Sequence, residues 1–225
     1  MAQTWAIRAG LGHEGWAGRD GWRDMYIKVC GLKSSEMVEV AIGAGADAIG
    51  VVHAAGSPRH LDMDTAREVI AAARGRVDTA LVVATFPVLE AVEMARELGV
   101  SVLQLHGNYA AADFAYAREN FSRIWRATSL KKNPDLHVGA QGEELILLDA
   151  PKAGSGEAWD LSALATSRPD GNWLLAGGLN PENVAQAIAV AQPWGVDVSS
   201  GVESAPGKKD SELIRLFVAR ARAAA

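Results

Sequence analysis

Two glycine-bearing stretches near the end of the chain decide the fold. They read Trp173-Leu174-Leu175-Ala176-Gly177-Gly178-Leu179-Asn180-Pro181 and Gly195-Val196-Asp197-Val198-Ser199-Ser200-Gly201-Val202-Glu203. Each stretch is a short apolar run that ends in glycine or serine. An apolar run that stops at glycine exposes backbone N–H groups with no side chain in the way, which suits an anion and above all a phosphate. We therefore expect a phosphate site between the ends of two neighbouring strands.

Outward from these stretches, short apolar runs alternate with helical patterns from residue 26 onward. The strand-like runs are Tyr26–Val29, Ala48–Val52, Thr79–Ala84, Val102–Leu105, Arg123–Ala127, Leu145–Leu148, Trp173–Ala176 and Val196–Val198. The helical patterns cover residues 34–45, 64–74, 87–98, 109–119, 134–140, 161–166, 181–191 and 210–222, with Asn180 as an expected N-cap. The runs are rich in Val, Ile and Leu without clean alternation, which is typical of parallel strands buried on both faces.

This succession of strand–helix units predicts an α/β fold, a single-domain (β/α)8 TIM barrel over residues 25–225. A doubly wound open sheet is the alternative, but its glycine-rich turn normally follows the first strand of the chain. Phosphate sites of TIM barrels commonly use the loops after the seventh and eighth strands, where the two stretches fall. Residues 1–24, in which tryptophans lie among several glycines, are expected to form an irregular N-terminal extension.

The composition excludes several classes of partner and ligand. The formal net charge of −5 and a pI near 5.6 leave no basic stripe for a nucleic acid. No apolar run has the length of a membrane span, and the N-terminus lacks the apolar core of a signal peptide. The histidines and carboxylates show no metal-ligand spacing, so no metal is expected. The single cysteine, Cys30, excludes a disulfide within the chain and favours a cytoplasmic location.

Candidate catalytic residues follow from the rule that TIM-barrel sites form at the carboxyl ends of the strands. Cys30 follows the first run, where it is either a thiolate base or nucleophile, or a small buried apolar side chain. Lys28 points to the same side of that strand and would lower the pKa of the thiol if it is close. Asp149 ends the sixth run, where an apolar barrel mouth can raise the pKa of a carboxyl and make it an acid. The alternative for Asp149 is a helix-capping or loop aspartate.

Other polar residues at strand ends are candidates for ligand binding. Arg59 is either a fork-shaped clamp for a carboxylate or phosphate, or a solvated cation. Gln104 and His106 lie at the end of the fourth run, and His53 follows the second. Both histidines are expected to be structural rather than catalytic. Asp197 lies inside its run, so it is a candidate structural partner within the barrel.

A series of segments in this order carries a resemblance over residues 26–222. They are Lys28-Val29-Cys30-Gly31, Gly43-Ala44-Gly45-Ala46-Asp47-Ala48, Ser57-Pro58-Arg59, Leu103-Gln104-Leu105-His106-Gly107, Leu147-Leu148-Asp149, Gly154-Ser155-Gly156 with Trp159-Asp160, Ala176–Val184 and Gly195–Glu203. Together they resemble the phosphoribosylanthranilate isomerases of tryptophan biosynthesis. Any one segment is weak, because glycine-rich phosphate loops recur in many barrels, but the whole series in this order is highly specific.

The resemblance implies an Amadori rearrangement of N-(5-phosphoribosyl)anthranilate to 1-(2-carboxyphenylamino)-1-deoxyribulose 5-phosphate, without a cofactor. Cys30 matches the general base that removes the proton from C2 of the sugar, and Asp149 matches the general acid that protonates the ring oxygen. Arg59 matches an arginine near the anthranilate end, and Gln104 and His106 are expected substrate contacts. The expected phosphate contacts are Gly177, Gly178, Ser199, Ser200 and Gly201.

The sequence departs from the family in the segment after the second strand. It has Val52-His53-Ala54-Ala55-Gly56 where an aromatic-rich stretch is usual. The alternatives are therefore another phosphosugar isomerase of the same barrel with altered substrate scope, or a non-catalytic phosphosugar-binding partner. The Lys28–Gly31 segment argues against bifunctional isomerases, which use a pair of aspartates in place of the cysteine–aspartate pair. The expected partner is a small phosphoribosyl substrate, and the expected state is a monomer, with a dimer as the alternative.

Overall fold

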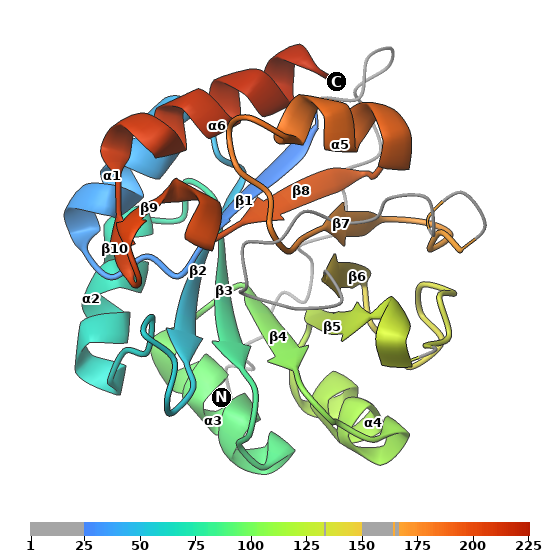
Figure 1. Ribbon diagram of the computed structural model, residues 1–225. Helices are drawn as coiled ribbons and strands as arrows, with labels where there is room; N and C mark the ends of the chain where they lie inside the picture. Colours follow the sequence, from blue (N-terminus) through green and yellow to red (C-terminus); the bar gives the residue numbers. More distant parts are fainter. Residues whose placement is uncertain (1–24, 133, 150–163, 165–166) are drawn as a thin grey trace, which may run out of the picture.

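The computed structural model describes residues 25–132, 134–149, 164 and 167–225, and its strands close into a parallel barrel in chain order (Figure 1). The strands are β1 (Tyr26–Cys30), β2 (Ala48–His53), β3 (Asp78–Val83), β4 (Val102–His106), β5 (Ile124–Ser129), β6 (Leu145–Asp149), β7 (Trp173–Leu175) and β8 (Gly195–Val198). The barrel closes where β1 pairs with β8, with Lys28 opposite Asp197. The predicted (β/α)8 barrel is confirmed, and the open-sheet alternative is excluded.

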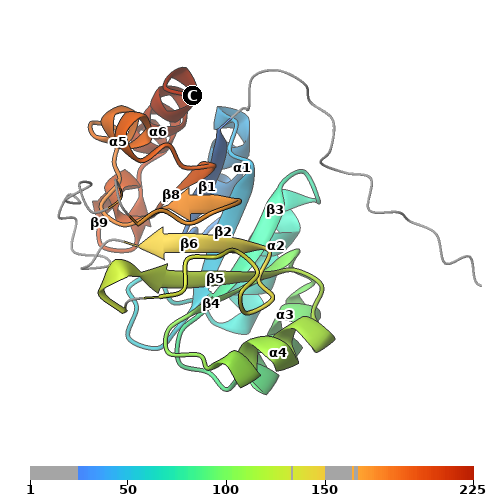
Figure 2. The same ribbon diagram turned by 90° about the vertical axis from the view of Figure 1, so that its right-hand side faces the viewer.

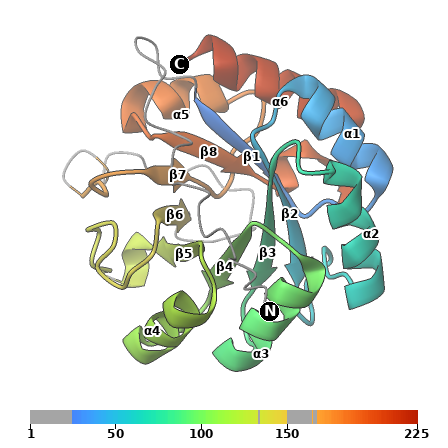
Figure 3. The same cartoon turned by 180° about the vertical axis from the view of Figure 1, so that it is seen from behind.

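The α-helices of the described residues lie on the outside of the barrel (Figures 1 and 3). They are α1 (Ser35–Ala44), α2 (Met63–Ala73), α3 (Val88–Leu98), α4 (Ala111–Asn120), α5 (Val184–Ala191) and α6 (Ser211–Ala223). Local sequence signals set their ends: the Ser34 hydroxyl accepts the Met37 N–H at the start of α1, and Gly45 ends α1 at a φ of 98°. None of these described helices combines the length and apolar character that crossing a membrane would require.

Short elements that the sequence analysis does not predict follow the carboxyl ends of β5 and β8. A 3-10 turn, η1 (Leu130–Lys132), follows β5, and another, η3 (Ser200–Val202), follows β8. A small antiparallel hairpin of β9 (Glu203–Ala205) and β10 (Lys208–Lys209) comes next and leads into α6. This hairpin brings charged residues to the rim of the barrel.

Two of the helix predictions are wrong, one entirely and one at its start. Residues 134–140 form no helix: Asp135 accepts a bond from Arg126 through its carbonyl, His137 bridges to Asp170, and Gly139 has a φ of 93°. These contacts outside the segment replace the bonds of a helix. The helix predicted over 181–191 begins only at Val184, and its N-cap is Asn183 rather than Asn180.

Asn180 has a related role one turn earlier. Its Oδ1 accepts the N–H groups of Glu182 and Asn183, and the Asn183 Oδ1 accepts the N–H of Asn180 in return. These bonds hold a turn that precedes the helix. The expected N-terminal extension at 1–24 lies outside the described residues, as does the expected helix at 161–166 apart from Leu164.

Side-chain alternation along the strands divides the buried residues into two sets. Ile27 and Val29 belong to the large apolar cluster that joins the barrel to its helices, while Tyr26 and Trp125 belong to a second cluster inside the barrel. Since successive side chains of a strand point to opposite faces, Lys28 and Cys30 share the inward direction of Tyr26. Figure 2 shows β4, β5 and β6 side by side, so the inward rows of neighbouring strands end at one mouth.

Candidate active site

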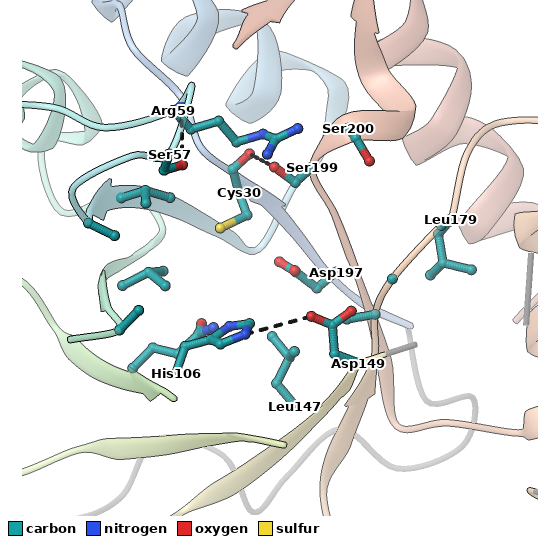
Figure 4. A pocket seen from close by; sticks show the side chains of 18 residues that line it. Cys30, Ser57, Arg59, His106, Leu147, Asp149, Leu179, Asp197, Ser199 and Ser200 are labelled. Atoms are coloured by element: carbon teal, nitrogen blue, oxygen red, sulfur yellow. Dashed lines mark hydrogen bonds and ion pairs between the residues drawn. The ribbon is translucent and has the colours of Figure 1, made fainter. Parts of the chain in front are cut away.

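A cavity of about 280 Å³ lies at the carboxyl ends of the barrel strands (Figure 4). The sequence-predicted site residues that line it are Cys30, Arg59, Gln104, His106, Asp149, Gly177, Gly178, Ser199 and Ser200. Cys30, Gln104, His106 and Asp149 all stand at inward positions of their strands. The fold thus brings together residues from most of the chain at the carboxyl end of the barrel, where TIM-barrel enzymes in general have their active sites.

Gly201 is the one predicted site residue that is not in the cavity lining. A Cβ at this position would lie 1.8 Å from the carbonyl oxygen of Leu179 and 2.8 Å from the Cα of Asn180. Only glycine allows this close approach, so Gly201 packs the loop after β8 against the loop after β7. Its direct contact with a phosphate remains a prediction.

Cys30 ends β1 with its sulfur turned into the cavity (Figure 4). Two residues earlier, the fully buried Lys28 donates from Nζ to Asp197 Oδ1 at 2.7 Å, so Asp197 is the predicted partner inside the barrel. Burial raises the pKa of the Cys30 thiol, and the positive charge of Lys28 opposes this effect without cancelling it. The Lys28 charge therefore acts in the predicted direction, but the net displacement is upward.

Asp149 ends β6 and faces the cavity from a different wall than Cys30 (Figure 4). His106 Nε2 lies 3.9 Å from Asp149 Oδ2. Burial lowers the pKa of His106, and the nearby Lys132 charge lowers it further. The imidazole is therefore neutral at neutral pH, so it places no fixed positive charge beside the carboxyl group of Asp149.

Arg59 is held at the rim of the cavity by Glu203. Its Nε and Nη2 donate to the two carboxylate oxygens at 2.7 and 2.8 Å, while Nη1 has no partner among the described residues. Lys209 Nζ donates to the same carboxylate at 2.7 Å. Burial opposes ionisation, yet the hydrogen bonds from Arg59 and Lys209 hold the pKa of Glu203 below its ordinary value. Two basic side chains share one carboxylate here, which favours an anionic ligand.

The loops after β7 and β8 form a further part of the rim, and the loop after β8 leads directly into Glu203, which holds Arg59. Gly177 and Gly178 have φ angles of 82° and 69°, a left-handed conformation in which glycine carries no Cβ penalty. Asn183 Nδ2 donates to the Gly178 carbonyl at 2.9 Å and fixes this turn. Ser199 donates from its hydroxyl to the Cys30 carbonyl at 3.1 Å, which ties the loop after β8 to the end of β1.

The segment 52–56 at the end of β2, where the sequence departs from the family that it resembles, forms part of an apolar wall. Val52 and Ala54 line the cavity together with Val82 and Ala84. His53 points elsewhere: its Nδ1 lies 2.7 Å from the Leu61 carbonyl oxygen, and its ring centroid is 4.8 Å from that of Phe86. This supports the structural interpretation of His53. A wall of small apolar side chains beside Arg59 suits a flat ring with a carboxylate.

Sequence reasoning missed Glu203 and Lys209 as parts of the site. Glu203 lies inside one of the two decisive stretches, but its partner Arg59 is 144 positions away, and no local pattern signals such a pair. The apolar wall has a signal in the sequence, since Val52 and Val82 occupy inward positions of β2 and β3, and Ala54 and Ala84 continue the same alternation just beyond the strand ends. Within the described residues, no group of three or more histidine, cysteine, aspartate or glutamate side chains is arranged to hold a metal ion.

The fold and this site define the class: a (β/α)8 barrel with a thiol and a carboxyl group facing one cavity at its carboxyl end. Comparison with known proteins gives the family. A family model described as N-(5'phosphoribosyl)anthranilate (PRA) isomerase matches residues 27–220. The N-(5'-phosphoribosyl)anthranilate isomerase of Afipia carboxidovorans is 38% identical over 213 residues, which is 89% of this chain and 90% of that protein.

Solved structures of similar fold point to the same family as the sequence comparisons. The crystal structure of TrpF from Jonesia denitrificans has a TM-score of 0.84 and 58% identity, covering 89% of this chain and 98% of its own. A phosphoribosyl anthranilate isomerase in complex with reduced 1-(o-carboxyphenylamino)-1-deoxyribulose 5-phosphate has a TM-score of 0.77 and 30% identity, covering 88% and 99%. The chain belongs to the phosphoribosylanthranilate isomerase family.

Proposed function

We propose that the protein converts N-(5-phosphoribosyl)anthranilate into 1-(2-carboxyphenylamino)-1-deoxyribulose 5-phosphate, an Amadori rearrangement in tryptophan biosynthesis. The observation that carries the proposal is the placement of Cys30 and Asp149 on different walls of one cavity. The reaction needs an acid at the ring oxygen of the sugar and a base at its C2, and the two groups must reach one ribose together. Strands β1 and β6 supply such a pair.

The proposed chemistry has two proton transfers. Asp149, in its protonated form, donates a proton to the furanose oxygen; the bond from that oxygen to C1 breaks, and the nitrogen lone pair forms an imine with C1. The Cys30 thiolate then takes the proton from C2, and the electron pair of that C–H bond forms the enamine. Tautomerisation to the ketone gives the product. At neutral pH Asp149 must be protonated and Cys30 deprotonated at the start of the reaction. Their environments must therefore push the two pKa values in opposite directions, that of Asp149 upward and that of Cys30 downward.

The remaining predicted residues orient the substrate in this proposal. The loops at Gly177, Gly178 and 199–201 bind the phosphate, while Nη1 of Arg59 binds the anthranilate carboxylate. Gln104 is the most specific case, because its side chain is buried and its Oε1 has no partner among the described residues. A buried acceptor without a donor is costly, so a ligand hydroxyl is a natural partner for it.

We assign the protein to the cytoplasm as a monomer. The cytoplasmic location rests on the biosynthetic activity and on the single cysteine, which is buried in the barrel and must stay a thiol to act. No chemistry of the proposed site draws on a second chain, because the cavity is formed by one barrel.

The test is an assay of purified protein for loss of N-(5-phosphoribosyl)anthranilate fluorescence. Since general acid–base groups contribute about 10²–10⁴-fold, Cys30→Ala and Asp149→Ala should each lose at least about a hundredfold in kcat. Asp64→Asn, which changes an exposed carboxylate away from the cavity, is the control and should turn over normally. Circular dichroism establishes that each variant is folded.

Two outcomes would overturn the proposal. A folded parent protein without turnover points to a different phosphosugar, and the apolar wall after β2 is then the first place to change. Binding of a product analogue without turnover points to a phosphosugar-binding protein.

A further inference from the structure

The mechanism leaves the buried charged pair inside the barrel unexplained. Lys28 is completely buried inside the barrel, and its Nζ lies 2.7 Å from Asp197 Oδ1 across the seam between β1 and β8. Burying two charges is expensive, and an apolar pair of similar volume often stabilises a fold as well or better. Lys28 does not line the cavity, so it has no direct contact with a substrate there. Asp197 does line the cavity, so it is the buried ammonium of Lys28 that needs a reason other than stability or direct binding.

Geometry places the Lys28 side chain directly beside the thiol. Lys28 and Cys30 point to the same side of β1, and both lie over Gly50 on the neighbouring strand β2. A Cβ on Gly50 would lie 2.8 Å from Cys30 Sγ and 3.3 Å from Lys28 Cε. The sulfur and the end of the lysine chain therefore crowd around one point, which is left open because residue 50 is a glycine.

The charges that face the sulfur come from three elements. They are Lys28 on β1, Asp197 on β8 and Lys209 on β10. Burial alone would lower the pKa of Lys28, but the interactions with Asp197 and Cys30 together raise it above its ordinary value, so the lysine stays charged. Of the two charges in the pair, the ammonium acts more strongly on the thiol than the carboxylate does.

We propose that Lys28, held in place by Asp197, is a positioning residue that stabilises the thiolate form of Cys30. The inference deepens the proposed function and rests on it, since a thiolate is the form that can accept the C2 proton. Lys28 supplies the positive charge next to the sulfur, Asp197 fixes that charge, and the absence of a side chain on Gly50 allows the contact. The pair thus offsets the burial that keeps the thiol protonated.

The test is a titration of the thiol, which needs no substrate. Cys30 is the single cysteine, so the ultraviolet absorbance of the thiolate reports on it alone, with Cys30→Ala as the blank. Lys28→Met should raise the pKa of Cys30 by at least about one unit, which leaves about tenfold less thiolate at any pH below that value. The acidic limb of kcat against pH should move upward by the same amount, with KM little changed.

Two further variants keep the result interpretable. Lys28→Met leaves a buried carboxylate without its partner, so Lys28→Met/Asp197→Asn is made alongside and should also raise the pKa of the thiol. The matched control is Arg126→Met/Glu143→Gln, which removes an equally buried pair, 2.7 Å long, on the outward side of β5. The control should lose stability without moving the thiol titration.

The outcomes separate the inference from the proposed function. An unchanged thiol titration in a folded Lys28 variant, single or double, overturns the inference even if the parent enzyme is active. A parent protein without isomerase activity overturns the proposed function, while the titration still measures whether Lys28 acts on the sulfur. A shift of equal size in the Arg126 control would also overturn the inference, because it would trace the effect to lost stability.

Discussion

The two ends of the barrel interior are built from the same inward rows of residues, yet they differ sharply. At the amino ends of the strands the interior is filled by large rings: Tyr26 stacks on Trp194 at 4.6 Å and meets the edge of Trp125 at 6.1 Å. At the carboxyl ends, the same rows finish in Cys30, His106 and Asp149 around a cavity. The character of each row changes from bulky and apolar to small or polar within about five residues.

The charged groups differ in the same way. At the amino end, Arg123 donates to both Asp78 and Glu144, and Asp78 also accepts the Tyr26 hydroxyl at 2.8 Å. The charged groups at this end are therefore paired with one another and with the Tyr26 hydroxyl. At the carboxyl end, Arg59 keeps one guanidinium nitrogen without a described partner. One end of the barrel is thus expected to supply stability and the other ligand binding, and substitutions at both ends can test this division.

The largest expected effect is at the amino end. Trp125→Ala should reduce the free energy of unfolding by about 3–5 kcal/mol, because it removes a fully buried ring from the filled half of the barrel. Urea unfolding measures this loss. The kcat/KM of the folded enzyme should change little, since Trp125 does not line the cavity.

Trp125→Phe is the matched control. Its ring still fills most of the space, and it removes an indole N–H that has no acceptor among the described residues. We expect a much smaller loss of stability than for alanine. Two results would contradict the division between a stabilising end and a binding end. One is a Trp125→Ala variant that unfolds at the same urea concentration as the parent; the other is a loss of kcat/KM in that variant while it is fully folded.

An intermediate effect is expected at the carboxyl end. Glu203→Gln keeps the shape of the side chain but removes the charge that holds Arg59, and charge-assisted bonds are worth about 1.5–3 kcal/mol. The KM for N-(5-phosphoribosyl)anthranilate should rise about tenfold or more, with a smaller change in kcat. Steady-state kinetics measure both.

Glu144→Gln provides the comparison, because Glu144 also receives two bonds from an arginine but lies at the amino end. This variant should keep the parent KM. Equal KM values for the Glu203 and Glu144 variants would show that the Arg59 clamp contributes nothing to binding.

The smallest expected effect is again at the amino end. Burial raises the pKa of Tyr26, with the Asp78 charge adding to it, so the phenol stays a hydrogen-bond donor. Tyr26→Phe removes this bond but leaves Asp78 paired with Arg123, so the loss of stability should be about 1 kcal/mol. Thermal unfolding checks the value, and a loss several times larger would mean that the ring itself has moved.

Much of this division was predictable from the sequence. The eight runs found the strands to within about two residues, because parallel strands buried on both faces have an unmistakable composition. The rule that chemistry follows strand ends found Cys30, Asp149 and Arg59. Alternation along β1 also predicted that Lys28 shares the side of Cys30, and the structure agrees.

Other features depend on contacts that no local pattern contains. The predicted helix at 134–140 failed because Asp135 and His137 bind distant residues, and helical propensity gives way to such contacts. The β9–β10 hairpin and its Lys209 were missed since two strands of three and two residues leave no periodic signal. The upward displacement of the Cys30 pKa needed the burial of the sulfur, which only the packed barrel provides.

The pairing of β1 with β8 has a consequence for the synthesis and folding of the enzyme. Lys28 and Cys30 leave the ribosome early, whereas Asp197, the partner of Lys28, is translated 169 positions later. Contacts between residues so far apart in the sequence form late in folding, because the entropy of closing a long loop is lost before the contact stabilises the chain. The thiol therefore lies beside a fixed ammonium only once nearly the whole chain has been made. Nascent chains that stop short of the last barrel strand would carry the cysteine without the lysine–aspartate pair proposed to stabilise its thiolate.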